Sequence, residues 1–367
     1  MKIVLVNEFS DVNCPVTKLV YDLGAELTLV ADTHVVQANL RTKYRPGGTR
    51  WQRVLSLILC HLGIPVVVMY QVFLSAIKGQ KICVVVTTLP PLLHWNLLVL
   101  ASVLRFRCVV WYQDAHPEIE ARMLQRRGFS WLPRMLSGID EVILKLPQRI
   151  VVLDEAMFDL ITVDRKIPSE RVKIAAPWST FVSPTKKLRQ PHFSASQPIR
   201  LIYAGNYGFA HDISPLAGAL SKLSNELKSK ILITGIGMNA PSQERFKDLF
   251  TAAGITVNLL HRTESFKALL ELFDEFDFGL VSLREDSVGL ASPSKAYTYI
   301  SQGLPILYVG PKRALPDGLV KMGFGISLDD FIQALAVGAF PSLKSGGSLM
   351  EDPKKTSIEA IMRVIYE

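Results

Sequence analysis

Short, uninterrupted runs of apolar and β-branched residues recur along the whole chain, and segments of helical character separate most of them. A strand that is apolar at every position is buried on both faces, as in a parallel sheet covered by helices. The repeated strand–helix pattern therefore predicts an α/β protein with two doubly wound, Rossmann-like domains. The expected strands are KIVLV (2–6), ELTLV (26–30), ICVVVT (82–87), RCVVWY (107–112), RIVVL (149–153), RVKIA (171–175), RLIYA (200–204), KILIT (230–234), ITVNLL (255–260), DFGLVS (277–282) and PILYV (305–309).

A stretch rich in proline, serine, threonine and lysine interrupts this pattern near the middle of the chain. Because 367 residues exceed what one core usually organises, we interpret this stretch as a linker between two domains. We expect the domains to face each other across a cleft, where the carboxyl ends of the strands would bind ligands. The expected parts are an N-terminal acceptor domain (1–180), the linker (181–198), a C-terminal donor domain (199–345) and a terminal helix (346–367) that crosses back to the first domain.

The net charge of +8 is concentrated in the first half of the chain. Twelve Lys and Arg residues lie between Arg41 and Arg127, against only Asp114, Glu118 and Glu120. Such a region can face phosphate, nucleic acid or an anionic membrane. The sequence contains no helix-turn-helix, zinc-finger or RNP-like pattern, so we expect no nucleic-acid partner.

The four cysteines, Cys14, Cys60, Cys83 and Cys108, show no C-x-x-C spacing, which fits reduced thiols in a reducing compartment. The N-terminal residues MKIVLVNEF resemble a short strand and lack the features of a signal peptide. We therefore expect a cytoplasmic protein.

One long segment, Val54 to Ile77, contains no Lys, Arg, Asp or Glu, and Arg50, Arg53 and Lys78 flank it. Its length would allow a membrane span, but Gly63 and Pro65 interrupt it. The remaining alternatives are helices that cover the sheet, or a basic and apolar surface that docks on the inner leaflet of the membrane.

The loop after the first strand of the second domain has the sequence YAGNYGFAHD (203–212). Glycines directly after a buried strand allow backbone N–H groups to approach a ligand closely, and a helix starting near Asp212 would add its positive dipole end. Gly205, Asn206, Gly208 and His211 are therefore candidates for a phosphate site, with a plain tight turn as the alternative.

A second candidate lies in LASPSKAYTYISQGLPILY (290–308), which follows the expected strand DFGLVS. Lys295 would supply a point charge for a phosphate, and the Ser292 and Ser294 hydroxyls would add donors. The alternative is a helix N-cap at Ser292 with Pro293 in the first turn. Two such sites at the ends of different strands indicate a diphosphate between them.

These residues resemble the motifs of GT-B glycosyltransferases that build bacterial surface polysaccharides from nucleotide sugars. YAGNYGFAHD resembles Y-S-G-N-x-G-x-x-H-D, and SPSKAYTYISQGLPI resembles P-S-K-x-x-E-Y-x-x-x-G-x-P-V. VVWYQDAHPE (109–118) resembles the first-domain strand that ends in D-x-x-P-E, while IVVLDEAMFDLI and KIAAPWS resemble the close of that domain. The resemblance spans nearly the whole chain.

The resemblance implies a retaining transferase that moves a sugar from a nucleotide diphosphate sugar to a lipid-linked or glycan acceptor. From the basic charge and the long apolar segment we expect the protein to be peripheral on the anionic inner face of the cytoplasmic membrane. It implies no metal or other cofactor, and the sequence has no D-x-D pair at a strand end in the cleft. The oligomeric state stays open. The donor-binding residues that the motifs imply are Gly205, Asn206, Gly208, His211, Leu260, Arg262, Gly289, Leu290, Ala291, Ser292, Ser294, Lys295 and Thr298.

The chain departs from the family pattern at two positions. Many relatives carry a pair of glutamates, at the donor sugar and at the ribose hydroxyls, where this chain has Leu290 and Thr298. A threonine hydroxyl is a weaker partner for a ribose diol than a carboxylate. The alternative function is therefore a non-catalytic, glycosyltransferase-like subunit that binds a nucleotide or an active partner enzyme; an epimerase is disfavoured because it would need carboxylates near the sugar.

On the acceptor side, Asp114, His116 and Glu118 follow a buried strand and are the candidate catalytic residues. A carboxylate or imidazole there would orient or deprotonate an acceptor hydroxyl. The alternative is a helix start, with Asp114 as cap and Pro117 in the first turn.

Overall fold

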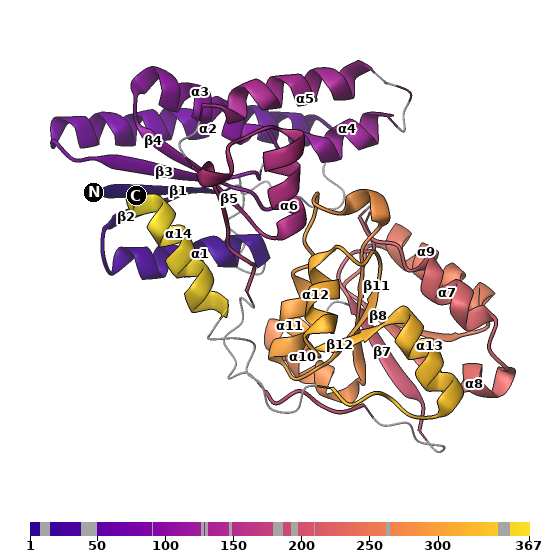
Figure 1. Ribbon diagram of the computed structural model, residues 1–367. Helices are drawn as coiled ribbons and strands as arrows, with labels where there is room; N and C mark the ends of the chain where they lie inside the picture. Colours follow the sequence, from indigo (N-terminus) through magenta and orange to yellow (C-terminus); the bar gives the residue numbers. More distant parts are fainter. Residues whose placement is uncertain are drawn as a thin grey trace. The chain divides into compact units, whose positions relative to one another are not determined.

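The computed structural model describes most of the chain, and the statements below concern those residues alone. Within them the chain forms two compact units, drawn in indigo to magenta and in magenta to orange, with the yellow terminal helix in the first (Figure 1). The first unit comprises Met1–Thr180, Gly289–Ser292 and Pro353–Glu367, and the second comprises Phe181–Val288 and Pro293–Asp352. The described residues are 1–7, 15–37, 50–89, 91–125, 128, 131–146, 149–178, 186–191, 197–208, 210–261, 265–343 and 353–367.

The first unit is built on a six-stranded sheet in the order β2-β1-β3-β4-β5-β6, and every neighbouring pair is parallel. All six residues of β1 are buried, as the uninterrupted apolar runs predict for strands covered on both faces. The strands are β1 (Lys2–Asn7), β2 (Asp32–Gln37), β3 (Ile82–Thr87), β4 (Arg107–Trp111), β5 (Arg149–Val152) and β6 (Val172–Ile174).

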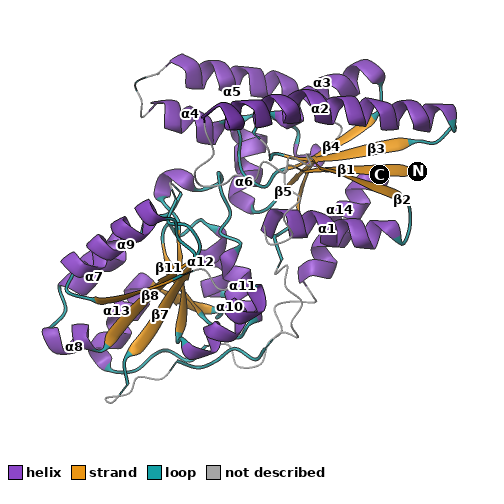
Figure 2. Ribbon diagram, turned by 180° about the vertical axis from the view of Figure 1, so that it is seen from behind, coloured by secondary structure: helices purple, strands orange, loops and turns teal. Residues whose placement is uncertain are grey.

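Helices cover both faces of this sheet (Figure 2). One face carries α2 (Arg50–Ile77), α3 (Leu93–Leu104) and α5 (Trp131–Leu144), while the other carries α1 (Pro15–Thr28) and α14 (Pro353–Tyr366). The shorter helices are α4 (Glu118–Gln125) and α6 (Glu155–Asp159). A π-helical turn, Leu160–Asp164, continues α6, and a 3₁₀ turn, Ser169–Arg171, precedes β6.

The terminal helix α14 belongs to the core of the first unit. Ile358, Ile361 and Ile365 are buried there at the spacing of one helical face. The Arg107 guanidinium, at the start of β4, donates a hydrogen bond to the Val364 carbonyl. The last residues of the chain therefore help to hold the first sheet.

The second unit repeats the plan with the strand order β12-β11-β10-β7-β8-β9, again parallel throughout. Its strands are β7 (Ile199–Ala204), β8 (Ile231–Ile236), β9 (Thr256–Leu260), β10 (Phe278–Ser282), β11 (Ile306–Val309) and β12 (Gly325–Ser327). Its α-helices are α7 (Ser214–Ser221), α8 (Asn225–Ser229), α9 (Ala240–Ala252), α10 (Phe266–Leu272), α11 (Lys295–Ser301), α12 (Leu315–Lys321) and α13 (Leu328–Val337), and 3₁₀ turns span Phe273–Glu275 and Glu285–Ser287.

The strands predicted from apolar runs are confirmed within a residue or two, with one exception. ELTLV (26–30) was expected to be a strand, but Leu27 and Thr28 end α1, and Leu29 and Val30 are exposed. Leu19, Leu23 and Leu27 recur every four residues and are buried, so the run continues a helical face. The strand that follows α1 is instead DTHVVQ (β2). The short β12 was not predicted, because it contains no apolar run.

Cys60, Cys83 and Cys108 are buried, and Cys14 lies outside the described residues. Burial raises the pKa of the Cys83 thiol to about 12 and also raises the pKa of Cys108, so both thiols stay protonated.

Candidate functional site

The strand order of the second unit places a topological switch point between β7 and β10. From β7 the chain runs outward through β8 and β9, and from β10 it runs outward the other way through β11 and β12. In open parallel sheets, ligands bind at the carboxyl ends of the strands at such a point. The two loops that the sequence singles out, after β7 and after β10, both start there.

The loop after β7 is fixed by its own backbone and by one amide side chain. Gly205 has a φ of +104°, a conformation that favours glycine, and its N–H donates to the Ile236 carbonyl at 2.9 Å. The side-chain oxygen of Asn206 accepts a hydrogen bond from the Asn239 N–H at 2.8 Å. Asn206 therefore ties the loop to the start of α9, while Asn206 and Gly208 stay exposed.

His211 connects this loop to the end of β10. Its Nδ1 lies 2.7 Å from the Ser282 carbonyl oxygen, which can only accept, so Nδ1 carries the proton. Burial, with the positive charge of Lys295, lowers the pKa of the imidazole to about 3. The ring is therefore neutral at physiological pH, and its Nε2 has a lone pair that can accept a hydrogen bond.

Lys295 is the first residue of α11, and its amino group is buried without a carboxylate partner. Its Nζ has no hydrogen-bond partner among the described residues and lies 3.8 Å from the centre of the Tyr203 ring. Burial lowers the pKa of this amine from 10.5 to about 7. A buried amine that carries at least part of a positive charge and lacks a counter-ion is a place where an anion gains binding energy.

Two tyrosines, Tyr203 and Tyr299, contact Lys295, His211 and the loop after β7. The Tyr203 hydroxyl donates to the Asn206 carbonyl at 3.1 Å, and the rings of Tyr203 and His211 pack edge to face with centroids 5.9 Å apart. The Tyr299 hydroxyl accepts from the Ala204 N–H at 2.8 Å. Neither tyrosine was singled out from the sequence, although Tyr203 opens the YAGN motif.

Of the other predicted donor residues of the second unit, Ser294 and Thr298 lie in or next to the helix that Lys295 begins, and Leu260 lies on another strand. Ser294 precedes α11 and makes no capping hydrogen bond through its side chain, and Thr298 is half-buried in the same helix. Leu260 ends β9, the edge strand two positions from β7. Arg262 lies outside the described residues.

Residues 289–292 belong to the first unit, although they connect β10 and α11 along the chain. Gly289 has a φ of +74°, and a Cβ there would lie 2.8 Å from the Ala156 carbonyl oxygen. Leu290 is buried against Ala115 and Ile119, and its carbonyl accepts from the Ala115 N–H at 2.8 Å. Leu290 therefore serves as a packing residue in this segment.

Ala291 and Asp114 form an antiparallel backbone bridge, so the structure brings these two predicted site residues together. The Ser292 side chain lies beside the Asp154 carboxylate. Burial raises the pKa of Asp154, and Ser292 is one of the smaller effects that lower it. Asp154 is the N-cap of α6. The alternative that Ser292 caps the next helix is wrong, because α11 begins at Lys295.

Asp114 is held by its backbone at the end of β4. The Thr88 hydroxyl donates to the Asp114 carbonyl at 2.8 Å and accepts from the N–H groups of Gln113 and Asp114. Burial raises the pKa of the Asp114 carboxyl, more than the nearby His116 lowers it. A carboxylate with a raised pKa is a better proton acceptor than an exposed one.

His116 and Glu118 are both engaged by neighbouring side chains. His116 is buried, and its Nδ1 lies 2.7 Å from Glu120, one turn further along α4. Glu118 forms an ion pair with Arg165, which also lies 3.4 Å from Asp140 of α5. Glu118 thus anchors α4, and Glu120, Arg165 and Asp140 are polar partners that the sequence did not single out.

Among the described residues, no three His, Cys, Asp or Glu side chains are grouped as a metal site would require.

The comparisons with known proteins give a match in structure only. No protein-family model matches the sequence, and a search of curated proteins finds no match. Among solved structures, the chain is similar to the lipopolysaccharide outer core galactosyltransferase WaaB in its apo form, with a TM-score of 0.62 at 11% identity over 100% of this chain and 99% of that one.

It is also similar to HepE of Anabaena in complex with UDP-glucose (TM-score 0.58, 10% identity, 100% of this chain and 97% of that one). A third similar structure is WaaG, a glycosyltransferase involved in lipopolysaccharide biosynthesis (TM-score 0.55, 11% identity, 100% and 91%). At these identities the likeness shows the fold. The α/β, GT-B fold class predicted from the sequence is confirmed.

Proposed function

We propose that this chain is a retaining glycosyltransferase that moves a sugar from a nucleotide diphosphate sugar to a lipid-linked or glycan acceptor in the synthesis of a cell-surface polysaccharide. The observation that carries the proposal is the buried Lys295 amine, which has no hydrogen-bond partner among the residues that the structure describes and stands at the switch point of a parallel sheet.

The chemistry around Lys295 favours a diphosphate as the ligand. Burying an amine without a counter-charge costs stability, and a protein recovers this cost when an anion binds. The His211 ring would donate from Nε2 to a second anionic oxygen once a bound diphosphate raises the pKa of the ring enough to protonate it. In the transfer step, these groups would stabilise the negative charge that develops on the leaving nucleotide diphosphate.

The structural neighbours support the same donor class. One structure of HepE contains UDP-glucose, another contains UDP and glucose, and WaaB is named as a galactosyltransferase. The lipopolysaccharide context of WaaB and WaaG supports a surface-polysaccharide product.

On the acceptor side, Asp114 would orient the attacking hydroxyl and accept its proton, with the departing phosphate assisting on the same face of the sugar. His116, held by Glu120, would help to position the acceptor. Lys295 would supply the positive charge that other transferases take from a metal ion, so we expect transfer to persist in EDTA.

The test is calorimetry of the purified chain with UDP, GDP and their sugars, followed by an assay for slow hydrolysis of whichever nucleotide sugar binds. Binding together with hydrolysis or transfer supports the enzyme. Binding without either supports the alternative, a non-catalytic subunit, which Leu290 and Thr298 favour because they stand where many relatives carry glutamates. No binding of any nucleotide would overturn the enzyme and would leave, of the alternative, only a subunit that binds an active partner enzyme.

A further inference from the structure

The longest helix of the first unit, α2, is apolar on its outer side as well as on its inner side. Its inner residues Cys60, Ile64 and Val68 are buried in the core at a spacing of four. Its outer residues Leu62 and Phe73 are 65% and 63% exposed, and the exposed Ile58, Val66, Val67, Met69, Tyr70 and Ile77 accompany them. A surface helix of a soluble domain normally carries charged or polar residues on this side.

The neighbouring helices extend this apolar surface. α3 contacts α2 on one side and α5 on the other, and the three form one layer over one face of the sheet (Figures 1 and 2). Exposed apolar residues also occur on these two helices. On α3 they are Val99, Val103 and Leu104, and on α5 they are Trp131, Met135, Ile139 and Val142. We call the exposed apolar residues of α2, α3 and α5 the apolar surface.

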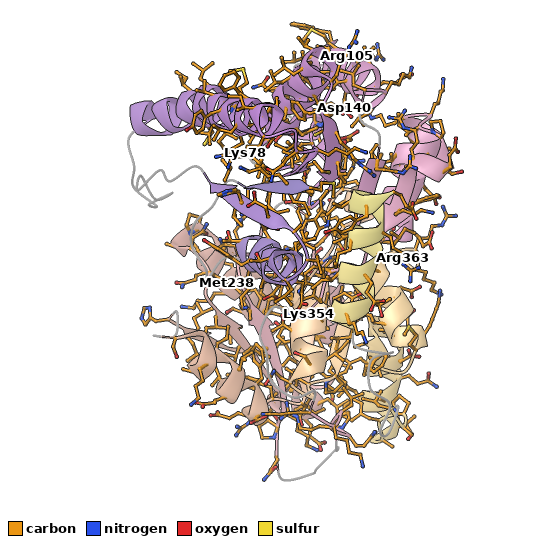
Figure 3. All side chains as sticks on the ribbon, turned by 90° about the vertical axis from the view of Figure 1, so that its left-hand side faces the viewer. Lys78, Arg105, Asp140, Met238, Lys354 and Arg363 are labelled. Atoms are coloured by element: carbon orange, nitrogen blue, oxygen red, sulfur yellow. The ribbon has the colours of Figure 1, made fainter. Side chains whose placement is uncertain are left out.

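One end of this layer is basic. Each of the three helices is followed at once by a basic residue, Lys78, Arg105 and Lys145 in turn. The strands that follow these helices, β3, β4 and β5, are adjacent and parallel, so the three basic residues lie at the end of the sheet where these strands begin. Lys78 and Arg105 are labelled in Figure 3. Lys145 also pairs with Glu141.

The sequence around α2 and α3 contains no acidic residue that would oppose an anion, while on α5 Asp140 is buried and Glu141 pairs with Lys145. Between Asp32 and Asp114 the chain has nine Lys or Arg residues and no Asp or Glu. An apolar surface next to unopposed positive charge matches the two parts of an anionic lipid leaflet, the acyl boundary and the headgroups. It does not match a second copy of the same basic surface, because like charges would then face each other.

The segment Cys60–Ile77 is long and apolar enough to cross a membrane, but its inner side is packed into the unit. α2 contacts β1 and β2 through that side. A helix that spans a bilayer cannot keep this contact with a water-soluble sheet, so α2 must lie flat in the plane of the interface.

We propose that the apolar surface docks on an anionic phospholipid bilayer, with α2, α3 and α5 parallel to the membrane plane and Lys78 and Arg105 at the headgroups. Arg107, one of the twelve basic residues between Arg41 and Arg127, donates to the Val364 carbonyl of α14, and the side chains of Arg50 and Arg53 lie outside the described residues. The proposal adds to the proposed function the place where a lipid-linked acceptor would be met. It is tested by membrane binding alone, so its failure is distinguishable from a failure of donor binding.

The experiment is co-sedimentation of the full chain with vesicles of phosphatidylcholine, with and without phosphatidylglycerol. We expect binding to the vesicles that contain phosphatidylglycerol, and partial release by high salt. The double variant Phe73→Ser/Ile77→Ser should lose most of this binding. The matched control is Leu29→Ser/Val30→Ser, two equally exposed apolar residues after α1 on the opposite face of the sheet, and it should bind like wild type.

The double variant Lys78→Ser/Arg105→Ser should reduce the partition coefficient roughly tenfold or more, since each basic residue near such a surface contributes about 1 kcal/mol. Thermal unfolding shows that each variant is folded. Wild type that stays in the supernatant at low salt would overturn the proposal. So would a concentration-dependent dimer that Phe73→Ser/Ile77→Ser converts to a monomer, because a second copy would then cover the surface.

Discussion

The Lys295 ammonium lies 3.8 Å from the centre of the Tyr203 ring and has no other polar partner among the described residues. The electron-rich face of an aromatic ring attracts a cation but does not neutralise it, as a carboxylate would. Lys295 is therefore held in place while its positive charge stays available to a ligand. The ring that holds it is itself fixed by contact with His211 and Phe246.

Replacing Lys295 by methionine should separate binding from stability. The variant keeps the aliphatic stem but removes the buried charge, so we expect the free energy of unfolding of the unliganded protein to rise by about 1–3 kcal/mol at neutral pH. Affinity for the nucleotide diphosphate should fall about tenfold or more, the size of a lost charge-assisted contact. Chemical denaturation and calorimetry measure the two effects.

The control is Lys222→Met at the exposed end of α7, which should change neither quantity appreciably. Unchanged donor affinity in Lys295→Met would remove Lys295 from the site. A loss of stability would show that the amine has a structural partner.

The affinity for the donor should fall as the pH rises above neutral. The pKa of the unliganded Lys295 amine is about 7, and a bound diphosphate raises it, so binding above pH 7 takes up a proton. Affinity should therefore drop by up to about tenfold per pH unit until the pKa of the complex is reached. His211, whose pKa is about 3 without ligand, adds proton uptake only if the ligand raises its pKa to the working range.

The stability of the unliganded protein should change with pH in the opposite direction. Lys295 has a lower pKa in the folded chain than its usual 10.5, so the unfolded chain binds more protons between about pH 7 and 10.5, and this group's contribution to stability rises across that window. Calorimetry in buffers of different ionisation enthalpy counts the protons. Lys295→Met should flatten both pH dependences, and equal proton uptake in the variant would assign the uptake to another group.

The sequence located the sheets better than it located the site. Strands such as ICVVVT are recognisable because they are apolar at every position, whereas β12 has the sequence GIS and exists through its pairing with β11. Gly325 is needed there because a Cβ would lie 2.1 Å from the Ile306 carbonyl oxygen, a contact that no local pattern reveals.

The site motifs pointed to Lys295 and His211 but not to their surroundings. The burial of Lys295 depends on Tyr203, about ninety positions earlier in the chain, and such tertiary contacts leave no periodic signal. In the same way, Glu118 was singled out for its position after a strand, and only the fold shows that Arg165 neutralises it.

Gly279 in β10 should not tolerate even one added carbon. A Cβ at this position would lie 2.3 Å from the Tyr299 ring, whose hydroxyl accepts the Ala204 N–H just before the Gly205 turn. We expect Gly279→Ala to cost about 1–3 kcal/mol of stability and also to weaken donor binding, because the ring must move. Denaturation and calorimetry provide the readouts.

The matched control is Gly218→Ala in α7, where a Cβ would meet nothing within 4 Å. This change should stabilise the protein by about 0.5–1 kcal/mol and leave binding unchanged. If Gly279→Ala proved as stable as wild type, the packing of Tyr299 against β10 would be wrong.

Asp114 and Glu118 should respond differently to the loss of their charge. Asp114→Asn preserves the shape of the side chain and the backbone hydrogen bonds with Thr88, but the amide cannot accept the proton of an acceptor hydroxyl. Transfer should fall about a hundredfold or more, with donor affinity unchanged.

Glu118→Gln removes one partner of the buried Arg165, so it should cost about 1–3 kcal/mol of stability while the folded enzyme keeps its turnover. Initial rates at saturating donor, corrected for the folded fraction, measure both. Because the sequence predicts both carboxylates to be catalytic, a rate loss in Glu118→Gln equal to that in Asp114→Asn would restore Glu118 to the reaction. Wild-type turnover in Asp114→Asn would leave Asp114 with only its backbone role beside Ala291.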